Sequence, residues 1–189
     1  MARSVGVTRE KLITVAGQLA DTHGLEHLTL AQVANELGIR VPSVYNHVDG
    51  IPGLHRELAI LGGRQLMEKI NRAVIGKYVD EAVIALAQVF YHYANGHPGL
   101  YAASVRAPAA DDLVAQQFVR EIVEVVLAVL APLQLEETNA IHAVRGLRSI
   151  IHGFVMLERA GGFGLPINRE ESFQFLINTF IIGLRTSCK

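Results

Sequence analysis

Apolar residues recur every three to four positions along most of the chain, and this spacing restricts the possible folds more than any other feature of the sequence. It places them on one face of an α-helix, and no segment shows the sustained alternation that is typical of a β-strand. Half of the 189 residues are hydrophobic, which is enough to build a core and argues against a disordered chain. We therefore predict an all-α protein.

Glycine, proline and helix-capping residues divide this pattern into segments. Three expected helices precede residue 49, and beyond them the segments become longer and more apolar. We therefore predict a small N-terminal domain, residues 1–49, and a larger C-terminal domain, residues 50–189. The expected helices span about residues 8–23, 29–37, 42–48, 54–74, 80–95, 111–130, 136–160 and 169–185, with a shorter piece near 100–105.

The sequence argues against export and against a membrane protein. The first seven residues contain one arginine and no apolar run, so we expect no secretory signal. The most apolar stretches, 122–135 and 173–184, are interrupted by polar residues or proline and are too short to span a bilayer. The single cysteine, Cys188, excludes an internal disulfide and a cysteine metal cage. We therefore expect a cytoplasmic protein with no membrane association.

Neither a metal, a cofactor nor a catalytic group is indicated. Of the eight histidines, His92 and His97 fall on different helix faces, and His142 and His152 lie about 15 Å apart along one helix. Neither pair has the spacing of a zinc-binding helix, although a metal sensor is the alternative. A serine elbow, a reactive cysteine and a phosphate-binding glycine loop are also absent from the sequence. We therefore expect no enzyme activity.

Residues 29–48, TLAQVANELGIRVPSVYNHV, contain the most informative motif. Thr29 and Gln32 have the spacing of a capping box, Gly38 permits a tight turn, and Pro42 suits the first turn of a second helix. This pattern predicts a helix-turn-helix unit, whose second helix enters the major groove of DNA. The alternative is a helical hairpin in which Tyr45 and His47 only cover the surface. The residues expected to face inward are Val33, Ala34, Leu37, Ile39, Val44 and Val48.

The side chains expected to face outward offer the chemistry that DNA recognition needs. Hydroxyl and imidazole groups donate to phosphate oxygens, asparagine and arginine pair with base edges, and valine or proline contacts a thymine methyl group. Up to Val74, eight lysines and arginines stand against seven acidic residues, so binding would depend on local contacts rather than on bulk charge. The candidate DNA-binding residues are Thr29, Arg40, Val41, Pro42, Ser43, Tyr45, Asn46 and His47.

With the preceding helix, the TLAQVANELG and VYNHV blocks give residues 8–60 a close resemblance to the TetR family of bacterial transcriptional regulators. Two further segments, HPGLY at 97–101 and HGFVMLERAGGFGLP at 152–166, resemble the C-terminal regulatory domain of one branch of that family. The resemblance implies a homodimer that binds a palindromic operator in double-stranded DNA. It also implies a pocket whose occupant alters the affinity for DNA.

The resemblance assigns base and phosphate contacts to Val41, Pro42, Ser43, Tyr45 and His47, with residues 29–31 near the DNA backbone. Two positions depart from the family pattern. Arg40 replaces a usual serine or threonine cap. Ile51 replaces a lysine that holds a phosphate, which predicts a shallower salt dependence by about one phosphate per half-site. Arg3, Arg9 and Lys11 are the cations available to compensate.

The C-terminal part of the sequence suggests a pocket for a small apolar or aromatic effector. For His152, the alternative is a packed histidine with a hydrogen bond at an interface. We interpret the chain as a repressor that such an effector releases from DNA, with an activator or a dual regulator as alternatives. The candidate ligand-binding residues are Phe90, Tyr93, Tyr101, Phe118, Arg148, His152 and Met156.

The last two long segments, 136–160 and 173–184, are apolar on more than one side. A helix on the outside of a monomer needs only one apolar stripe, so the surplus predicts a two-fold dimer of four packed helices. The alternative is that both helices lie at the centre of a single core. For the whole chain, the competing function is a helical-bundle small-molecule-binding protein or enzyme without DNA binding. The candidate interface residues are Phe154, Phe173, Phe180 and Leu184.

Overall fold

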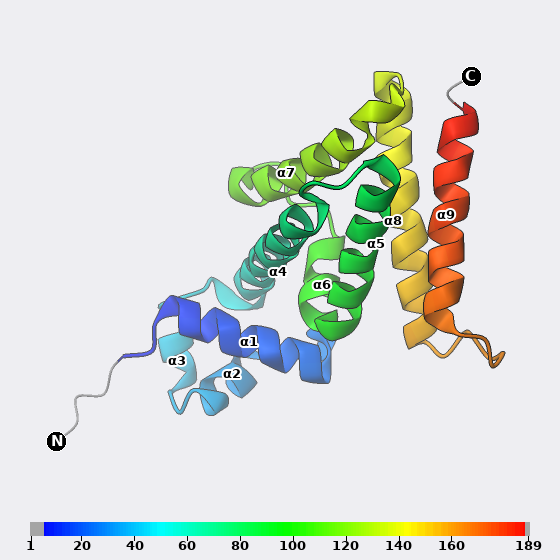
Figure 1. Ribbon diagram of the computed structural model, residues 1–189. Helices are drawn as coiled ribbons and strands as arrows, with labels where there is room; N and C mark the ends of the chain where they lie inside the picture. The colour runs from blue at the N-terminus through cyan, green and yellow to red at the C-terminus, as the bar shows by residue number, and fades with distance from the viewer. Residues whose placement is uncertain (1–5, 188–189) are drawn as a thin grey trace. The chain divides into compact units, whose positions relative to one another are not determined.

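The computed structural model describes residues 6–187, and these residues are helical with no β-strand among them (Figure 1). The predicted all-α fold is therefore confirmed. The α-helices are α1 (Arg9–His23), α2 (Leu30–Glu36), α3 (Val41–Val44), α4 (Gly50–Val74), α5 (Val79–Gly96), α6 (Pro98–Val105), α7 (Leu113–Leu130), α8 (Glu137–Arg159) and α9 (Arg169–Ser187). Two short 3-10 helices, η1 (Leu25–His27) and η2 (Ala131–Leu133), follow α1 and α7.

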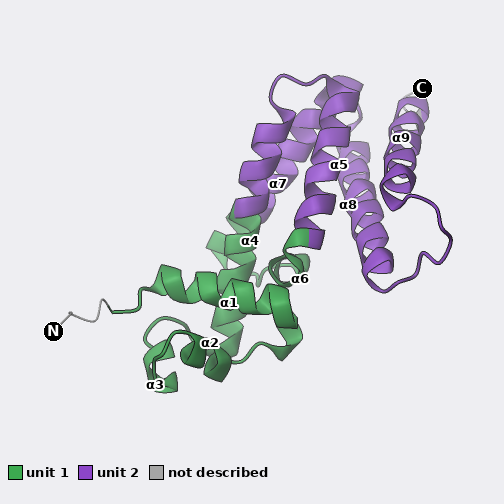
Figure 2. Ribbon diagram, turned by 60° about the horizontal axis from the view of Figure 1, so that its bottom comes forward, with its two compact units in different colours: residues 1–64, 96–118 green, residues 65–95, 119–189 purple. Residues whose placement is uncertain are grey.

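Contacts within the chain divide the described residues into two compact units (Figure 2). Unit 1 contains the residues up to Arg64 together with Gly96–Phe118, and unit 2 contains Gln65–Asn95 and the residues from Val119 onward. The divisions fall inside α4 and α7 and before the last residue of α5, so none of these helices belongs to one unit alone. The predicted boundary at residue 49 separates roles rather than contacts, and it stays a prediction.

Two helix boundaries differ clearly from the sequence expectation. Helix α4 begins at Gly50, before the expected start near residue 54, because Pro52 lies in its first turn, where a missing N–H costs no hydrogen bond. Gly50 itself has a φ of 69°, a conformation that favours glycine. Helix α3 covers only Val41–Val44 and continues as turns, in which the N–H groups of His47 and Val48 both donate to the Val44 carbonyl.

The core of unit 1 is formed by α1, α2, α3, the beginning of α4 and α6. Helix α1 turns its apolar stripe inward, and its first turn is capped by the Thr8 hydroxyl, which accepts from the N–H of Lys11 at 3.2 Å. The core holds the helix-turn-helix against the helices on either side of it in sequence. Its buried members are Leu12, Ala16, Ala20, Leu28, Leu30, Val33, Ala34, Val44, Val48, Leu54, Leu58 and Leu100.

The first turn of α6 packs directly on α1, and this contact explains the HPGLY segment. The Asp21 carboxylate of α1 accepts hydrogen bonds from the N–H groups of Gly99 and Leu100 at 2.8 and 3.0 Å. It also lies 2.9 Å from Nδ1 of His97. Asp21 thereby satisfies N–H groups that an isolated helix start leaves without a partner. At Gly99 a Cβ atom would lie 2.2 Å from the carbonyl carbon of Ala20, so only glycine permits this approach.

Unit 2 is built around an aromatic cluster contributed by α5, α8, the loop after α8, and α9. Tyr91 stacks on Phe173 with ring centroids 4.7 Å apart, and Phe154 packs edge-on against both rings. The Tyr91 hydroxyl donates to the Glu158 carboxylate at 3.0 Å. Burial, together with that hydrogen bond, raises the pKa of Tyr91 to about 12. The cluster and its polar partners join α5 to α8 and α9.

The α1–α6 contact predicts that Gly99→Ala destabilises the protein by about 2 kcal/mol, because overpacking against backbone atoms cannot be relieved by a rotamer change. Chemical unfolding monitored by circular dichroism measures the effect. Gly96→Ala is the matched control, since a Cβ there meets none of the described atoms within 4 Å. Equal stabilities of the two variants would contradict the close approach.

Candidate DNA-binding surface

Helices α2 and α3 pack together as a helix-turn-helix, and local sequence explains each part of it. Thr29 and Gln32 form the predicted capping box: the N–H of Gln32 donates to the Thr29 hydroxyl, and the N–H of Thr29 donates to the Gln32 side chain. Gly38, with a φ of 65°, makes the turn. Val44 and Val48 are buried in the unit 1 core, as predicted.

Most of the eight predicted DNA-binding residues are exposed. Tyr45, with 58% of its surface accessible, is the most exposed large side chain of α3 and the turns after it, residues 41–48, which we call the recognition segment. Ser43 and His47 are half-buried. The Thr29 hydroxyl also donates to the Gln32 side chain, so its capping role is structural. The exposed members are Thr29, Arg40, Val41, Pro42, Tyr45 and Asn46.

The two departures from the family pattern have visible consequences. Among the described residues, the Arg40 side chain makes no capping hydrogen bond at the start of α3. Ile51 is half-buried and packs against the unit 1 core rather than presenting a polar group. The recognition segment is therefore a short helix without a side-chain cap. Its position depends on contacts with other parts of unit 1.

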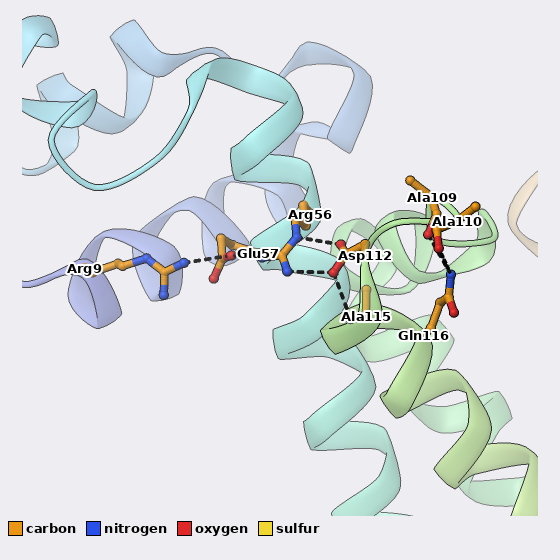
Figure 3. Close-up of polar contacts among 8 residues, drawn as sticks. All are labelled: Arg9, Arg56, Glu57, Ala109, Ala110, Asp112, Ala115 and Gln116. Carbon is orange, nitrogen blue, oxygen red and sulfur yellow. Dashed lines mark hydrogen bonds and ion pairs between the residues drawn. The ribbon is translucent and has the colours of Figure 1, made fainter.

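A chain of ion pairs supplies such contacts (Figure 3). Arg9 Nη2 lies 2.8 Å from the Glu57 carboxylate, and Arg56 Nη1 lies 2.7 Å from the same carboxylate oxygen. Arg56 also makes two hydrogen bonds to Asp112, at 2.5 and 2.7 Å. The Asp112 carboxylate in turn accepts from the N–H of Ala115 in the first turn of α7. The chain of contacts thus runs from α1 through α4 to α7, and all these residues belong to unit 1.

No local pattern in the sequence relates Arg56, Glu57 and Asp112 to one another or to the DNA-binding surface. Arg56 and Asp112 are 56 positions apart, and neither lies in a motif. Arg9 was noted only as a cation near the start of a helix. Arg3, noted with it, lies outside the described residues. The pairing exists because the fold brings α4 beside the start of α7, which spacing along the chain does not reveal.

The predicted ligand-binding residues are distributed over both units, and their role stays a prediction. Tyr101 and Phe118 belong to unit 1, where the Arg64 guanidinium lies 4.9 Å from the centre of the Phe118 ring. In unit 2, Tyr93 is buried and its hydroxyl donates to Gln65 at 3.1 Å. The remaining members of unit 2 are Phe90 and His152, which are half-buried, and Arg148 and Met156, which are exposed.

The predicted interface residues differ in burial. Phe154 and Phe173 are buried in the aromatic cluster of unit 2, so the subunit's own core already uses them. Phe180 packs near Gly146 of α8, and both Phe180 and Leu184 are half-buried. The exposed apolar side chains of α8 and α9 are instead Met156, Leu157, Phe175 and Ile182.

Within residues 6–187, no group of three or more histidine, cysteine, aspartate or glutamate side chains could hold a metal ion. None of the helices in the described part of the chain is both long and apolar enough to cross a membrane.

Comparison with known sequences now identifies the class of protein. The family model described as "Tetracyclin repressor-like, C-terminal domain" matches residues 83–180. The uncharacterized HTH-type transcriptional regulator YobS of Bacillus subtilis is 31% identical over 186 residues, which cover 97% of this chain and 96% of the relative. A second uncharacterized HTH-type transcriptional regulator, from Mycobacterium tuberculosis, is 35% identical over 85% of this chain and 74% of the relative. The chain belongs to the TetR family of helix-turn-helix proteins.

Solved structures agree with this fold. A protein of unknown function from Rhodococcus sp. RHA1 has a TM-score of 0.81 and 22% identity, covering 98% of this chain and 99% of that one. A TetR variant from Acinetobacter baumannii in complex with minocycline has a TM-score of 0.76 and 16% identity, covering 97% of this chain and 99% of the other. The matching family model and sequence relatives confirm the family resemblance, whereas the branch suggested by the HPGLY and HGF segments stays a prediction.

The Arg56–Asp112 pair predicts a pH-dependent contribution to stability. Hydrogen bonds from Arg56 hold the pKa of Asp112 below its usual value of 3.8. A lowered pKa in the folded state stabilises the fold above the unfolded pKa, and this stabilisation is lost as the pH falls through the folded value. Asp112→Asn should therefore destabilise most near neutral pH and progressively less below about pH 4.

Urea unfolding of wild type and Asp112→Asn at several pH values measures this difference. Glu124→Gln, which changes an exposed carboxylate in unit 2 on the same helix, is a control for the general effect of acid. A difference between wild type and Asp112→Asn that stays constant from neutral to acidic pH would contradict the pairing.

Proposed function

We propose that this protein is a transcription regulator that binds double-stranded DNA as a homodimer and inserts the recognition segment into the major groove. The observation that carries the proposal is the helix-turn-helix of α2 and α3: its apolar side is buried in unit 1, and its polar side remains exposed. Membership of the TetR family supports the same function. Because such proteins act on DNA, the cytoplasm is the expected place of action.

The exposed groups of the recognition segment suggest how DNA would be read. Asn46 can pair with an adenine edge, and Val41 and Pro42 can contact thymine methyl groups. The hydroxyl of Tyr45 can donate to a phosphate oxygen, which fixes register without reading sequence. We therefore assign sequence preference to the first turn of α3 and backbone contact to Tyr45 and His47.

A dimer is supported by the exposed apolar face of α8 and α9. Phe175 and Ile182 are 74% and 63% exposed, and they are seven positions apart on α9, so they lie on one side of the helix. A self-complementary patch of this kind suits a two-fold interface. Two recognition segments held about 34 Å apart would enter successive major grooves, which requires a palindromic operator. We propose this face, together with Phe180 and Leu184, as the dimer interface.

Regulation by a small molecule is the second part of the proposal. Phe90 and Tyr93, two of the predicted ligand-binding residues of unit 2, are aromatic and are suited to an apolar or aromatic effector. The TetR variant from Acinetobacter baumannii in complex with minocycline is a precedent for a ringed organic ligand on this fold. We propose that effector binding weakens the affinity for DNA, so that the protein acts as a repressor. This requires the effector to bind the DNA-free conformation more tightly.

The competing function is a helical-bundle protein that binds or converts a small molecule without binding DNA. The relatives are named as transcriptional regulators, not enzymes, which favours the first proposal. Selection of a duplex from random DNA, followed by footprinting on the DNA that flanks the gene, separates the two. A palindromic footprint supports a regulator, and turnover of a small molecule without any selected duplex supports the alternative.

Tyr45→Ala should reduce binding of the selected duplex at least tenfold, because an exposed phosphate contact is lost. The free energy of unfolding should change by no more than about 1 kcal/mol, since the side chain is outward-facing. Fluorescence anisotropy with labelled duplex measures the affinity. Tyr78→Ala, which removes another exposed tyrosine in the turn between α4 and α5, should leave it unchanged. Equal affinity of wild type and Tyr45→Ala would refute this placement.

Ile182→Glu should convert the proposed dimer into monomers, because it places a charge in the centre of an apolar interface. Sedimentation velocity measures the molecular mass in solution. Ile75→Glu introduces the same charge at an exposed isoleucine between α4 and α5 and should leave the dimer intact. A dimer that survives Ile182→Glu would place the interface elsewhere.

A further inference from the structure

Arg9 directs its guanidinium group to two other elements of unit 1. Its Nε donates to the backbone carbonyl of His47 at 3.2 Å, and its Nη2 lies 2.8 Å from Glu57 Oε1. The side chain is 55% exposed, and its Nε and Nη2 are both bonded to acceptors of the protein itself. One residue at the start of α1 is thus bound both to the end of the recognition segment and to α4.

The second partner is held firmly. The Glu57 side chain is 10% exposed and accepts from two arginines, Arg9 and Arg56 (Figure 3). Arg56 is itself bonded through two nitrogens to Asp112, and Asp112 caps α7. A planar guanidinium with two parallel hydrogen bonds has a defined orientation. Glu57 therefore provides a fixed point to which Arg9 attaches.

The recognition segment needs such an attachment. Helix α3 has four residues, and within the described structure Arg40 provides it with no side-chain cap. A short helix leaves several carbonyl groups without helical partners at its end, and a cation bonded to one of them stabilises that end. Arg9 supplies such a bond at His47, which lies three residues beyond α3 in the turns that end the recognition segment and is one of the residues assigned to the DNA backbone.

We propose that Arg9 is a positioning residue for DNA binding, which holds the end of the recognition segment against Glu57, rather than a cation that contacts a phosphate. The inference rests on the proposed function, because it concerns how the same surface is kept ready for DNA. The proposal also gives Glu57 a role. Although Glu57 is acidic and lies next to the DNA-binding surface, it increases the affinity for DNA because it holds Arg9 in place.

Arg9→Lys and Arg9→Gln test the proposal with the duplex selected by the wild-type protein. One ammonium group cannot reach both the His47 carbonyl and Glu57 as the guanidinium fork does, so both variants should bind about tenfold more weakly. A phosphate contact would instead be preserved by lysine. Lys69→Gln, an exposed cation in unit 2, is the control for loss of one positive charge and should bind like wild type. Wild-type affinity of Arg9→Lys overturns the proposal.

The salt dependence of binding gives a second readout. A lost phosphate contact lowers the slope of log K against log salt by about 0.9 for each half-site. If Arg9 is a positioning residue, Arg9→Gln lowers the affinity for DNA, whereas its salt-dependence slope stays equal to that of wild type. A slope reduced by the phosphate amount overturns the proposal.

For Glu57→Gln, the proposal predicts a change in DNA affinity opposite to the one that electrostatics alone predicts. Removal of a negative charge near DNA raises affinity when only Coulomb attraction acts. If Glu57 holds Arg9 in place, Glu57→Gln should instead lower the affinity several-fold, in a protein whose unfolding midpoint is checked in parallel. Tighter binding by Glu57→Gln overturns the proposal.

Amide hydrogen exchange measured without DNA tests the inference independently of the proposed function. The N–H groups of His47 and Val48 donate to the Val44 carbonyl, and their exchange should be several-fold faster in Arg9→Gln than in wild type. If wild type selects no duplex, the proposed function fails, while faster exchange still supports the attachment at His47. Unchanged exchange at these two amides overturns the inference even when DNA binds.

Discussion

The close approach of α6 to α1 is the contact on which the organisation of unit 1 depends. It requires three things at once: no side chain at Gly99, a carboxylate at Asp21 and a helix start at Pro98. Together they bring a helix that follows residue 95 into the same compact unit as the helix-turn-helix. The core around the helix-turn-helix therefore includes Leu100, a residue far from it in the sequence.

The ion pairs of unit 1 likewise join segments that are far apart in the sequence. Glu57 is buried, and its burial is tolerated because two arginines neutralise it and supply hydrogen bonds. The same pairs link the first residue of α1 to the start of α7 within unit 1. A regulator needs its DNA-binding surface held in one geometry until a signal changes that geometry. Directional hydrogen bonds and ion pairs hold it more specifically than apolar packing alone.

In unit 2, two apolar faces of the same helix differ in burial. Phe173 and Ile177 of α9 are buried in the subunit, whereas Phe175 and Ile182 are exposed. Because both sets are hydrophobic, hydropathy alone cannot distinguish the face turned to the core from the face that stays exposed. The aromatic packing of Phe173 on Tyr91 and Phe154 makes that distinction.

The sequence alone determined the helices, the Thr29–Gln32 capping box and the helix-turn-helix, because these depend on residues within a few positions of one another. It also located the exposed positions of the recognition segment, since helical periodicity separates Val44 and Val48 from Tyr45. Tertiary structure decided the role of HPGLY, the burial of Phe173 and the attachment of Arg9 to His47 and Glu57. The physical reason is distance along the chain. Contact forms only after the helices pack between Asp21 and Gly99 and between Arg56 and Asp112, and no local sequence pattern indicates these pairs.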